Sequence, residues 1–357
     1  MNKFTKGLFC SLIVLLCVGY VQGQEKSSAN YARKGWVSDL LLIYNGGAHR
    51  SNVWDEEKFE SCIYAKDKNG KYGWLFDSFL FLEIHDGTNS FASGYKPTPA
   101  RKDHWMGLMN TNLTEGYGIK ALNDCIEKAK RICKDPFRKR KLVMSLPEPI
   151  PNQKNWGSVK GKKLDFSKTE DRIEAVKWYI DYVEQRLKQE KLKNVELEGF
   201  YWLAEEATNS RTIVNKIADY IRSKGYRFYW IPYFNTDGRD EWKQLGFDQA
   251  FLQPNHFFND NIPDSRIDEA CLIARMQGMS MEMEFDENAA EKRGNKGSRM
   301  KAYIDGFTRN NVWDTSDVAY YQGGEALYVL KNGSDKDRKL YNELANIIIE
   351  RQRKRNK

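Results

Sequence analysis

The sequence predicts an α/β protein that folds as a single-domain (β/α)8 TIM barrel after a cleaved signal peptide. Eight apolar runs of about strand length are spread along the chain. Amphipathic segments lie between them, and such alternation is typical of a parallel sheet covered by helices. Eight units in roughly 300 residues fit the usual size of this barrel. An open doubly wound sheet is the alternative, but the chain lacks the glycine-rich first turn with which such sheets bind dinucleotides.

The eight runs are rich in β-branched, aromatic or long apolar residues. They cover residues 40–45, 75–83, 142–146, 197–203, 228–234, 250–253, 279–285 and 318–322. Helices are predicted over residues 170–189, where Ile173, Val176 and Ile180 share one stripe, over 212–223, which Gly225 ends, and over 338–351. The predicted domains are a signal peptide (1–23), a linker (24–35), the barrel (36–350) and a solvated basic tail (351–357).

The N-terminus resembles an export signal. Lys3 and Lys6 precede an apolar stretch at residues 8–20, and residues 21–23 resemble a small-residue cleavage site. The stretch is shorter than the roughly 20 residues of a membrane-spanning helix, so the mature chain is expected to have no integral membrane segment and to be periplasmic or secreted. The alternative is a lipoprotein acylated at Cys17, but Leu16 is bulky where such sites favour a small residue.

The composition limits the class of function. The 357 residues are 41% hydrophobic and 13% aromatic, which excludes an intrinsically disordered protein. Lysine and arginine (57) exceed aspartate and glutamate (49), but both signs are interspersed and no nucleic-acid-binding motif occurs, so no nucleic-acid partner is expected. With four histidines and no HExxH or CxxC pattern, the chain is expected to hold no metal and no cofactor.

Polar and aromatic residues gather where the predicted strands end. In chain order they are Glu83, His85, Glu148, Trp202, Glu205, Glu206, Tyr233, Asn235, Gln253, Asn255, Glu282, Glu284, Tyr321 and Gln322. Asp77 is a further candidate for contact with substrate, although it lies early in its strand. Long insertions follow the second and third strands at residues 86–111 and 147–168. Because active sites of such barrels lie at the carboxyl ends of the strands, one cleft is expected there.

The carboxylates at these strand ends suggest a chemistry. Glu282 and Glu284 lie two apart in one strand and therefore share a face, which we expect to be the interior because Met281 and Met283 suit packing against helices. Ion pairing within the barrel would be a purely structural explanation for one such acid. Acids at several strand ends favour a site, and opposed carboxylates with few histidines are typical of glycoside hydrolysis.

Two resemblances follow from these residues. The acid that follows Tyr201-Trp202-Leu203-Ala204 and the Glu284-Phe285 pair resemble the acid/base and nucleophile of clan A retaining glycosidases, although Ala204 replaces the familiar asparagine. The segments FDSFLFLE (76–83), EGFYWLAEE (198–206), QPNHFF (253–258) and MEMEFDE (281–287) resemble a family of exported proteins of gut Bacteroidetes known only as a domain of unknown function. The second resemblance implies a setting of polysaccharide degradation.

The functional prediction is a glycosidase with a carbohydrate substrate. Glu205 is expected to be the general acid/base with Glu206 in reserve, and Glu284 the nucleophile with Glu282 in support. The sequence leaves the choice within each pair open. The alternative is a non-catalytic glycan-binding protein on the same barrel, in which the acids accept hydrogen bonds from sugar hydroxyls.

Overall fold

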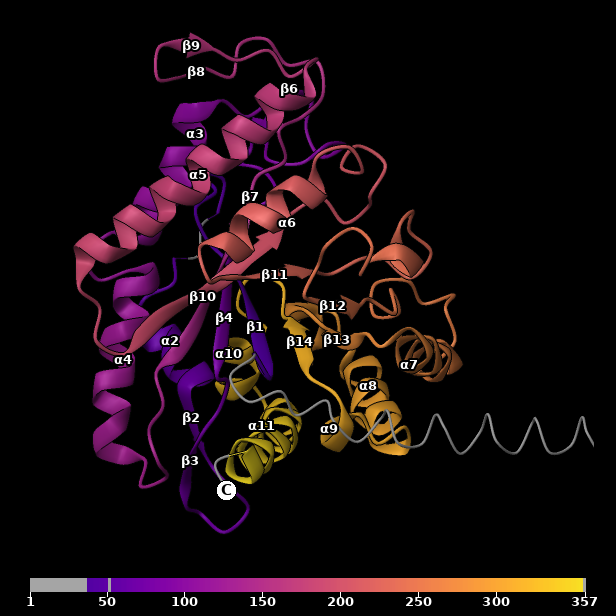
Figure 1. The fold of residues 1–357 in the computed structure, drawn as a ribbon. Coiled ribbons are helices and arrows are strands. Elements are labelled where there is room, and N and C mark those ends of the chain that lie inside the picture. The colour runs from indigo at the N-terminus through magenta and orange to yellow at the C-terminus, as the bar shows by residue number, and fades with distance from the viewer. Residues whose placement is uncertain (1–36, 51–52, 356–357) are drawn as a thin grey trace, which may run out of the picture.

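Eight parallel strands form a closed barrel in the computed structural model, which describes residues 37–50 and 53–355 (Figure 1). The predicted (β/α)8 fold is confirmed. In order around the barrel the strands are β1 (Asp39–Tyr44), β4 (Ser78–Leu82), β7 (Arg140–Leu146), β10 (Val195–Trp202), β11 (Arg227–Trp230), β12 (Gln249–Leu252), β13 (Ser280–Glu284) and β14 (Val318–Tyr321), which pairs with β1. Each strand falls within or overlaps one of the eight predicted runs.

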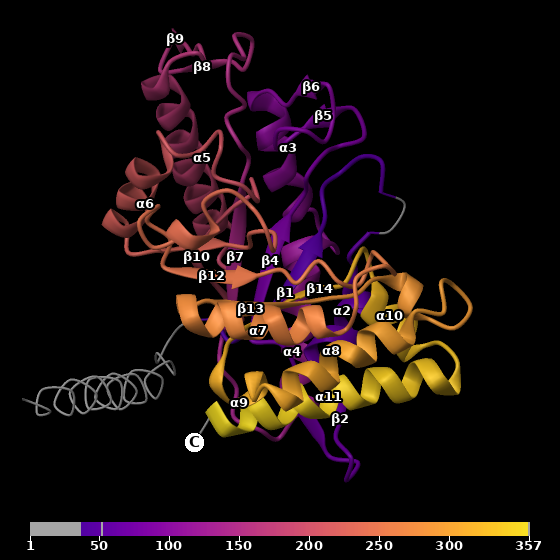
Figure 2. The same cartoon turned by 90° about the vertical axis from the view of Figure 1, so that its right-hand side faces the viewer.

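Helices surround the barrel, with α5 and α6 on one side and α7, α8 and α11 on another (Figures 1 and 2). The bounds are α2 (Glu56–Ile63), α3 (Lys102–Asn112), α4 (Gly118–Ile132), α5 (Thr169–Glu190), α6 (Val214–Ser223), α7 (Ser265–Gln277), α8 (Gly297–Arg309), α9 (Val312–Thr315), α10 (Ala326–Lys331) and α11 (Asp335–Arg355). Short 3-10 helices occur at Arg239–Glu241 and Glu287–Ala289. In the parts of the chain that the structure describes, no helix is long and apolar enough to cross a membrane. The predicted signal peptide and linker lie outside the described residues.

The two long insertions carry short elements of their own. The first contains β5 (Asn89–Ser90), β6 (Thr98–Pro99) and α3, and the second contains the hairpin of β8 (Ser158–Val159) and β9 (Lys162–Lys163). A further hairpin, β2 (Tyr64–Lys66) with β3 (Tyr72–Trp74), precedes β4. The insertions pack together, because the buried rings of Trp105 and Trp156 meet at 5.1 Å between centroids.

The register of the strands fixes which side chains face the interior. Glu282 pairs with Ala319 and Glu284 with Tyr321, so these four residues share the inner face of β13 and β14. Met281 and Met283 are buried on the outer face, which the helices cover. The strand alternation deduced from the sequence therefore places both glutamates inside the barrel.

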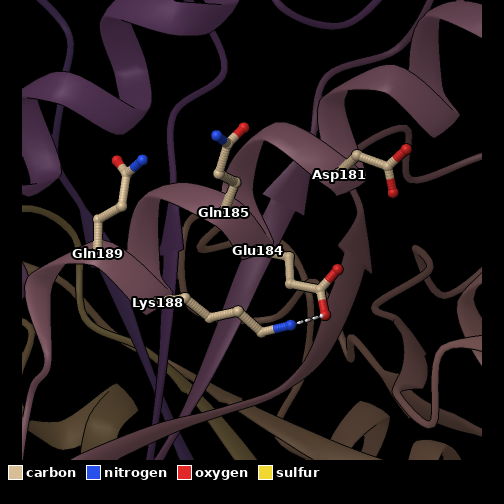
Figure 3. Close-up of a pocket in the computed structure, with 5 residues that line it drawn as sticks. All are labelled: Asp181, Glu184, Gln185, Lys188 and Gln189. Carbon is tan, nitrogen blue, oxygen red and sulfur yellow. Dashed lines mark hydrogen bonds and ion pairs between the residues drawn. The ribbon is translucent and has the colours of Figure 1, made fainter.

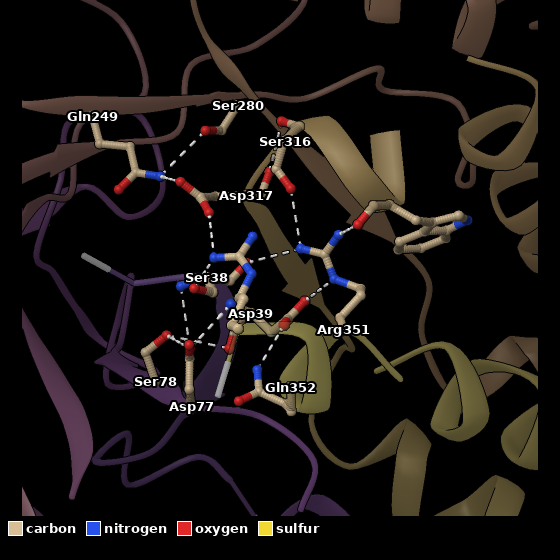
Figure 4. Close-up of polar contacts among 12 residues, drawn as sticks. Ser38, Asp39, Asp77, Ser78, Gln249, Ser280, Ser316, Asp317, Arg351 and Gln352 are labelled. Carbon is tan, nitrogen blue, oxygen red and sulfur yellow. Dashed lines mark hydrogen bonds and ion pairs between the residues drawn. The ribbon is translucent and has the colours of Figure 1, made fainter. Parts of the chain in front are cut away.

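The amino ends of the strands are closed by a polar network that involves α11 (Figure 4). The buried Asp39 accepts hydrogen bonds from Arg351 Nε, Gln352 Nε2 and the Tyr320 hydroxyl, each at 2.8 Å. Residues 351–355 are therefore helical and partly buried, and the predicted solvated tail is wrong for them. Arg351 and Gln352 point inward and close the amino end of the barrel, whereas Lys354 is exposed.

Asp77 belongs to this same closed end. Its Oδ1 accepts hydrogen bonds from the backbone N–H groups of Ser38 (3.2 Å) and Asp39 (3.0 Å) and from the Ser78 hydroxyl (2.8 Å) (Figure 4). It thus lies just before β4, at the end opposite to the carboxyl ends of the strands. The prediction that Asp77 contacts substrate is corrected, because its carboxylate is used to fix the start of the barrel.

We expect Arg351→Ala to destabilise the barrel strongly. Removing the guanidinium leaves the Asp39 carboxylate buried without its cation, which typically costs about 3–5 kcal/mol. Lys354→Ala is the matched control on the same helix, because the Lys354–Asp314 pair is largely exposed and such pairs contribute about 1 kcal/mol or less. Urea denaturation of both variants measures the difference. Equal free energies of unfolding for the two variants would contradict a structural role for the buried pair.

Candidate active site

A cavity of about 210 Å³ opens at the carboxyl ends of the strands. It is smaller than the roughly 300–1,000 Å³ of sites for drug-sized ligands, which suits one small ring or one residue of a longer chain. The residues that line it come from six barrel strands or the segments after them and from the first insertion. They are Leu42, Tyr44, Tyr95, Tyr201, Glu205, Ile231, Tyr233, Gln253, Asn255, Phe258, Glu282, Glu284 and Tyr321.

Glu205 lies three residues after the end of β10 and is held by donors from two directions. Gln253 Nε2 donates to Oε1 at 2.8 Å, and the Tyr95 hydroxyl donates to Oε2 at 3.0 Å. Glu205 is half-buried, and protein atoms surround its carboxyl closely enough for desolvation to raise its pKa. The carboxyl is therefore fixed in orientation and more easily protonated than an ordinary glutamate.

Glu284 ends β13 and is 2% exposed. The Tyr303 hydroxyl, from α8, donates to its Oε2 at 2.5 Å, and the backbone N–H of His256 donates to the same oxygen at 3.3 Å. Burial raises the pKa of Glu284 to about 7, although the Tyr303 hydrogen bond acts in the opposite direction. Glu284 therefore changes its charge near neutral pH.

Glu282 lies one layer deeper on the same face of β13 and is 3% exposed. It makes no hydrogen bond or ion pair with any residue in the described part of the chain. Burial raises its pKa well above the ordinary value, and the nearby charges of Glu284 and Glu205 add to the effect. Burial and the neighbouring carboxyls therefore favour the protonated form of Glu282.

Asn255 connects the two sides of the cavity. Its Nδ2 donates to Gln253 Oε1 at 2.9 Å and to Glu284 Oε1 at 3.5 Å, while its Oδ1 accepts from the backbone N–H of Phe234 at 2.8 Å. Since Gln253 in turn donates to Glu205, a chain of side-chain amides links the two carboxyls. The backbone of Asn255 has a left-handed φ of 52°, a conformation that asparagine tolerates better than most residues. This turn also directs the following His256 N–H toward Glu284.

The structure brings together seven of the residues predicted for the site. Glu205, Glu282, Glu284, Tyr233, Gln253, Asn255 and Tyr321 all line the cavity. Glu206 does not line it and is exposed to solvent, which favours Glu205 within that pair. All seven lie on the inner faces of strands or within three residues of the strand ends, so the predicted strand ends were enough to indicate them.

Four other predicted residues lie near the carboxyl ends of the strands but do not line the cavity. Glu83 is buried in an ion pair with Arg50, Nη2 to Oε1 at 2.8 Å, and His85 contacts the ring of His49 at 4.3 Å. Glu148 accepts a hydrogen bond from the Ser93 N–H at 2.6 Å, and Asn235 is exposed. Glu83 and Glu148 thus bond residues of the loops at this end of the barrel, Arg50 and Ser93, and His85 and Asn235 lie in the segments that follow β4 and β11.

Two further predictions are corrected by the direction of the side chains. Trp202 is fully buried and contacts Phe228 at 6.3 Å, and its Nε1 donates to Ser210 Oγ at 2.9 Å. It points outward because its neighbour Tyr201 takes the inner face. Gln322 is also fully buried, and its Oε1 accepts from the Leu327 N–H at 3.1 Å, so it fixes the start of α10.

The sequence did not single out several aromatic residues of the site. Tyr44, Tyr201 and Phe258 line the cavity, as does Tyr95 from the first insertion. Alternation along β1 and β10 could have indicated Tyr44 and Tyr201. Tyr303 contacts Glu284 from a helix, and no pattern in the sequence relates the two positions.

We expect Tyr303→Phe to move the pH dependence of any reaction that needs ionised Glu284. The Tyr303 hydroxyl lowers the pKa of Glu284, so its loss raises that pKa above about 7. Activity should therefore fall more at pH 6 than at pH 8, with the acidic limb of kcat/KM shifted to higher pH. Tyr341→Phe is the matched control, because this buried hydroxyl donates to the Ser61 carbonyl, at 2.8 Å, and makes no contact with the cavity. An unshifted limb in Tyr303→Phe would contradict the positioning role.

A second hollow lies on the outer surface of α5 (Figure 3). It is lined by Asp181, Glu184, Gln185, Lys188 and Gln189, and Lys188 Nζ donates to Glu184 Oε1 at 2.7 Å. All five residues come from one helix face with an ordinary i, i+4 ion pair, and none comes from a strand end. The side chains around this hollow therefore do not converge from different elements on one point, as the residues of an active site do.

The described residues contain no group of three or more histidine, cysteine, aspartate or glutamate side chains placed to hold a metal ion. The cysteines Cys62, Cys125, Cys133 and Cys271 are free and buried. The polar groups that line the cavity are carboxyl groups, side-chain amides and tyrosine hydroxyls.

The solved structures that align with this fold are distant in sequence. A candidate alpha-L-fucosidase from Bacteroides thetaiotaomicron is 14% identical, with coverage of 86% of this chain and 94% of that chain and a TM-score of 0.43. The carboxyl transferase domain of pyruvate carboxylase from Rhizobium etli is 9% identical (92% and 48% coverage, TM-score 0.40). The tryptophan synthase alpha-subunit from Pyrococcus furiosus is 10% identical (87% and 97%, TM-score 0.36). Likeness at this level does not bear on function.

No curated protein matches the chain in sequence. A family match covers residues 39–346, from the first strand of the barrel to the middle of α11. All lining residues of the cavity fall within this range. The chain therefore belongs to the family described as "Domain of unknown function (DUF4855)".

Proposed function

We propose that this protein is a glycoside hydrolase whose cavity holds one sugar residue between Glu205 and Glu284. The observation that carries the proposal is the pair of carboxyls at the ends of β10 and β13, three strands apart, joined by the amides of Gln253 and Asn255 in one aromatic cavity. Two carboxyls on opposite sides of a glycosidic bond are the usual requirement for its hydrolysis. Tyrosine rings suit the apolar faces of sugars, and tyrosine hydroxyls can hydrogen-bond to sugar hydroxyl groups.

In this proposal Glu205 is the general acid. Its proton passes to the oxygen of the leaving group as the bond between that oxygen and the anomeric carbon breaks. Tyr95 and Gln253 orient the carboxyl for this transfer. Desolvation raises its pKa, which keeps a larger fraction protonated near neutral pH than in an exposed glutamate.

Glu284 is the nucleophile. Its ionised oxygen attacks the anomeric carbon, and water, activated by the Glu205 carboxylate, later releases the sugar and returns the proton to Glu205. Hydrogen bonds from Tyr303 and the His256 N–H favour the ionised form, whereas Glu282 has no such donors. This difference in donors supports Glu284 over Glu282.

A non-catalytic glycan-binding protein is the second candidate. The raised pKa values of all three glutamates favour it, because protonated carboxyls donate and accept hydrogen bonds without reacting. The two functions differ in one result. A binding protein retains a glycan without releasing new reducing ends, whereas a hydrolase releases them.

The test is a reducing-end assay on a panel of poly- and oligosaccharides with wild-type protein and the Glu205→Gln/Glu284→Gln double variant. We expect release by wild type and none by the double variant. Glu206→Gln is the matched control, since it removes an exposed carboxylate next to Glu205 and should stay active. Binding of a glycan without release by wild type would favour the second candidate. Release by the double variant would overturn the assignment of the site.

Export remains a proposal, which N-terminal sequencing of protein from the native cell tests.

A further inference from the structure

We infer that the cavity is built for a positively charged sugar, an amino sugar residue with a free, protonated amine. This inference rests on the proposed function and adds the substrate class. It follows from the balance of charge in the cavity, from the unpartnered Glu282 and from the aromatic rings around them.

The cavity holds three carboxyl groups and no basic side chain. No lysine, arginine or histidine is among the described residues that line it. The guanidinium of Arg50 lies outside the lining, 4.8 Å from the centroid of the Tyr44 ring, and both of its bonded nitrogens are used by Glu83. The carboxyls therefore receive no compensating charge from the protein. An anionic sugar is disfavoured by the same balance.

Glu282 is a carboxyl that hydrolysis does not need. Glu205 and Glu284 supply the acid and the nucleophile, and each is held by hydrogen-bond donors. Glu282 faces the cavity, is 3% exposed and has no hydrogen-bond partner in the described parts of the chain. Its carboxyl oxygens are not enclosed by protein atoms but face the cavity, so they are placed to bond a group that arrives with the ligand.

The lining also suits an ammonium group. Phe258 meets Tyr321 edge to face at 5.5 Å, and Tyr201 lines the wall beside them. One face of Tyr44 already carries the Arg50 guanidinium, so the rings left for a ligand cation are those of Tyr201, Phe258 and Tyr321. Aromatic faces attract cations, and attract them more strongly in a site shielded from water. A neutral sugar would gain the stacking contacts alone, whereas a protonated amine gains the ring faces and a charge-assisted hydrogen bond to a carboxylate.

Binding of the amine should release a proton. The crowding of the two buried carboxyls of Glu282 and Glu284 favours retention of a proton by the pair. An ammonium beside the pair favours its fully ionised form, so the proton leaves as the cation enters. A neutral sugar makes no such exchange.

The experiment is isothermal titration calorimetry with glucosamine, galactosamine and mannosamine, their N-acetylated forms and the neutral parent hexoses. Each titration is repeated in two buffers of different ionisation enthalpy, which reports protons released. We expect at least one amine to bind about tenfold or more tightly than its N-acetylated and neutral counterparts, with release of up to about one proton. Glu282→Gln, which keeps the shape of the side chain, should remove this preference and the proton release. Glu206→Gln should keep both, which controls for a general loss of negative charge.

The outcomes separate this inference from the proposed function. Equal or weaker binding of every amine relative to its counterparts, or an unchanged preference in Glu282→Gln, would overturn the inference. Hydrolysis of neutral glycans in the reducing-end assay would then leave the proposed function standing. Selective binding of an amine with no release of reducing ends from amino-sugar oligomers would support the inference and overturn the hydrolase.

Discussion

Glu284→Gln is expected to lower kcat by about 10⁴-fold or more on every glycoside that the wild-type protein hydrolyses. The glutamine amide occupies the same space and still accepts a hydrogen bond from Tyr303, but it cannot attack the anomeric carbon. Initial rates at saturating substrate measure the loss. A variant with a tenth or more of the wild-type kcat would exclude Glu284 as nucleophile.

The same variant is expected to be more stable than wild type at alkaline pH. The pKa of Glu284 is about 7 in the folded protein against an ordinary value of 4.5. Its folded-state pKa is raised, so its contribution to stability is fully present below about pH 4.5 and is lost as the pH rises through about 7. At full ionisation of Glu284 the expected loss of stability is on the order of 3 kcal/mol, because a tenfold change in a proton equilibrium corresponds to about 1.4 kcal/mol. Glutamine does not ionise, so urea denaturation at pH 8 should favour the variant, and the gain should vanish near pH 4. Lost activity with gained stability distinguishes a functional carboxyl from a structural one.

Glu205→Gln is expected to lower kcat by about 10²–10⁴-fold on substrates with poor leaving groups. Substrates with very good leaving groups need little protonation at the departing oxygen, so they should lose much less in the first step. The basic limb of kcat/KM, which reports loss of the proton from the general acid, should disappear in this variant because glutamine has no proton to lose. A comparison of aryl glycosides with different leaving groups measures the first effect. The pH profile measures the second.

Glu206→Gln is the control for this variant. It lies one residue further along and is exposed, so it should keep the wild-type dependence on the leaving group. Equal losses for good and poor leaving groups in Glu205→Gln would contradict the role of general acid. A large, selective loss in Glu206→Gln would move that role to its neighbour.

The barrel was predictable because parallel strands are buried on both faces. Such strands appear in the sequence as short apolar runs, and β1, β4 and β14 stand out for this reason. Period-two alternation was enough to place Glu282 and Glu284 inside. The end of α11 was not predictable from its composition, since Arg351 and Arg355 look like a solvated basic run until Asp39 and Asp317 are placed opposite them.

The site was predictable only where its residues come from strand ends. Glu205, Gln253 and Asn255 lie within three residues of the ends of β10 and β12, and position alone indicates them. Tyr95 lies in an insertion and Tyr303 in a helix, so their contacts with the glutamates depend on tertiary packing. The prediction that Trp202 contacts substrate is wrong because neighbouring residues of a strand face opposite sides. Tyr201 faces the cavity, so Trp202 faces the helices.

Rescue by azide distinguishes the carboxylate that attacks the anomeric carbon, which we expect to be that of Glu284. Glu284→Ala leaves room for a small anion beside that carbon, and Glu282→Ala leaves room one layer deeper. On an activated aryl glycoside that the wild-type protein hydrolyses, azide should restore turnover in Glu284→Ala, and the product should be a glycosyl azide of anomeric configuration opposite to that of the substrate. Azide should have no such effect on Glu282→Ala. Rescue of Glu282→Ala with no rescue of Glu284→Ala, or full activity of Glu284→Ala without azide, would contradict the account.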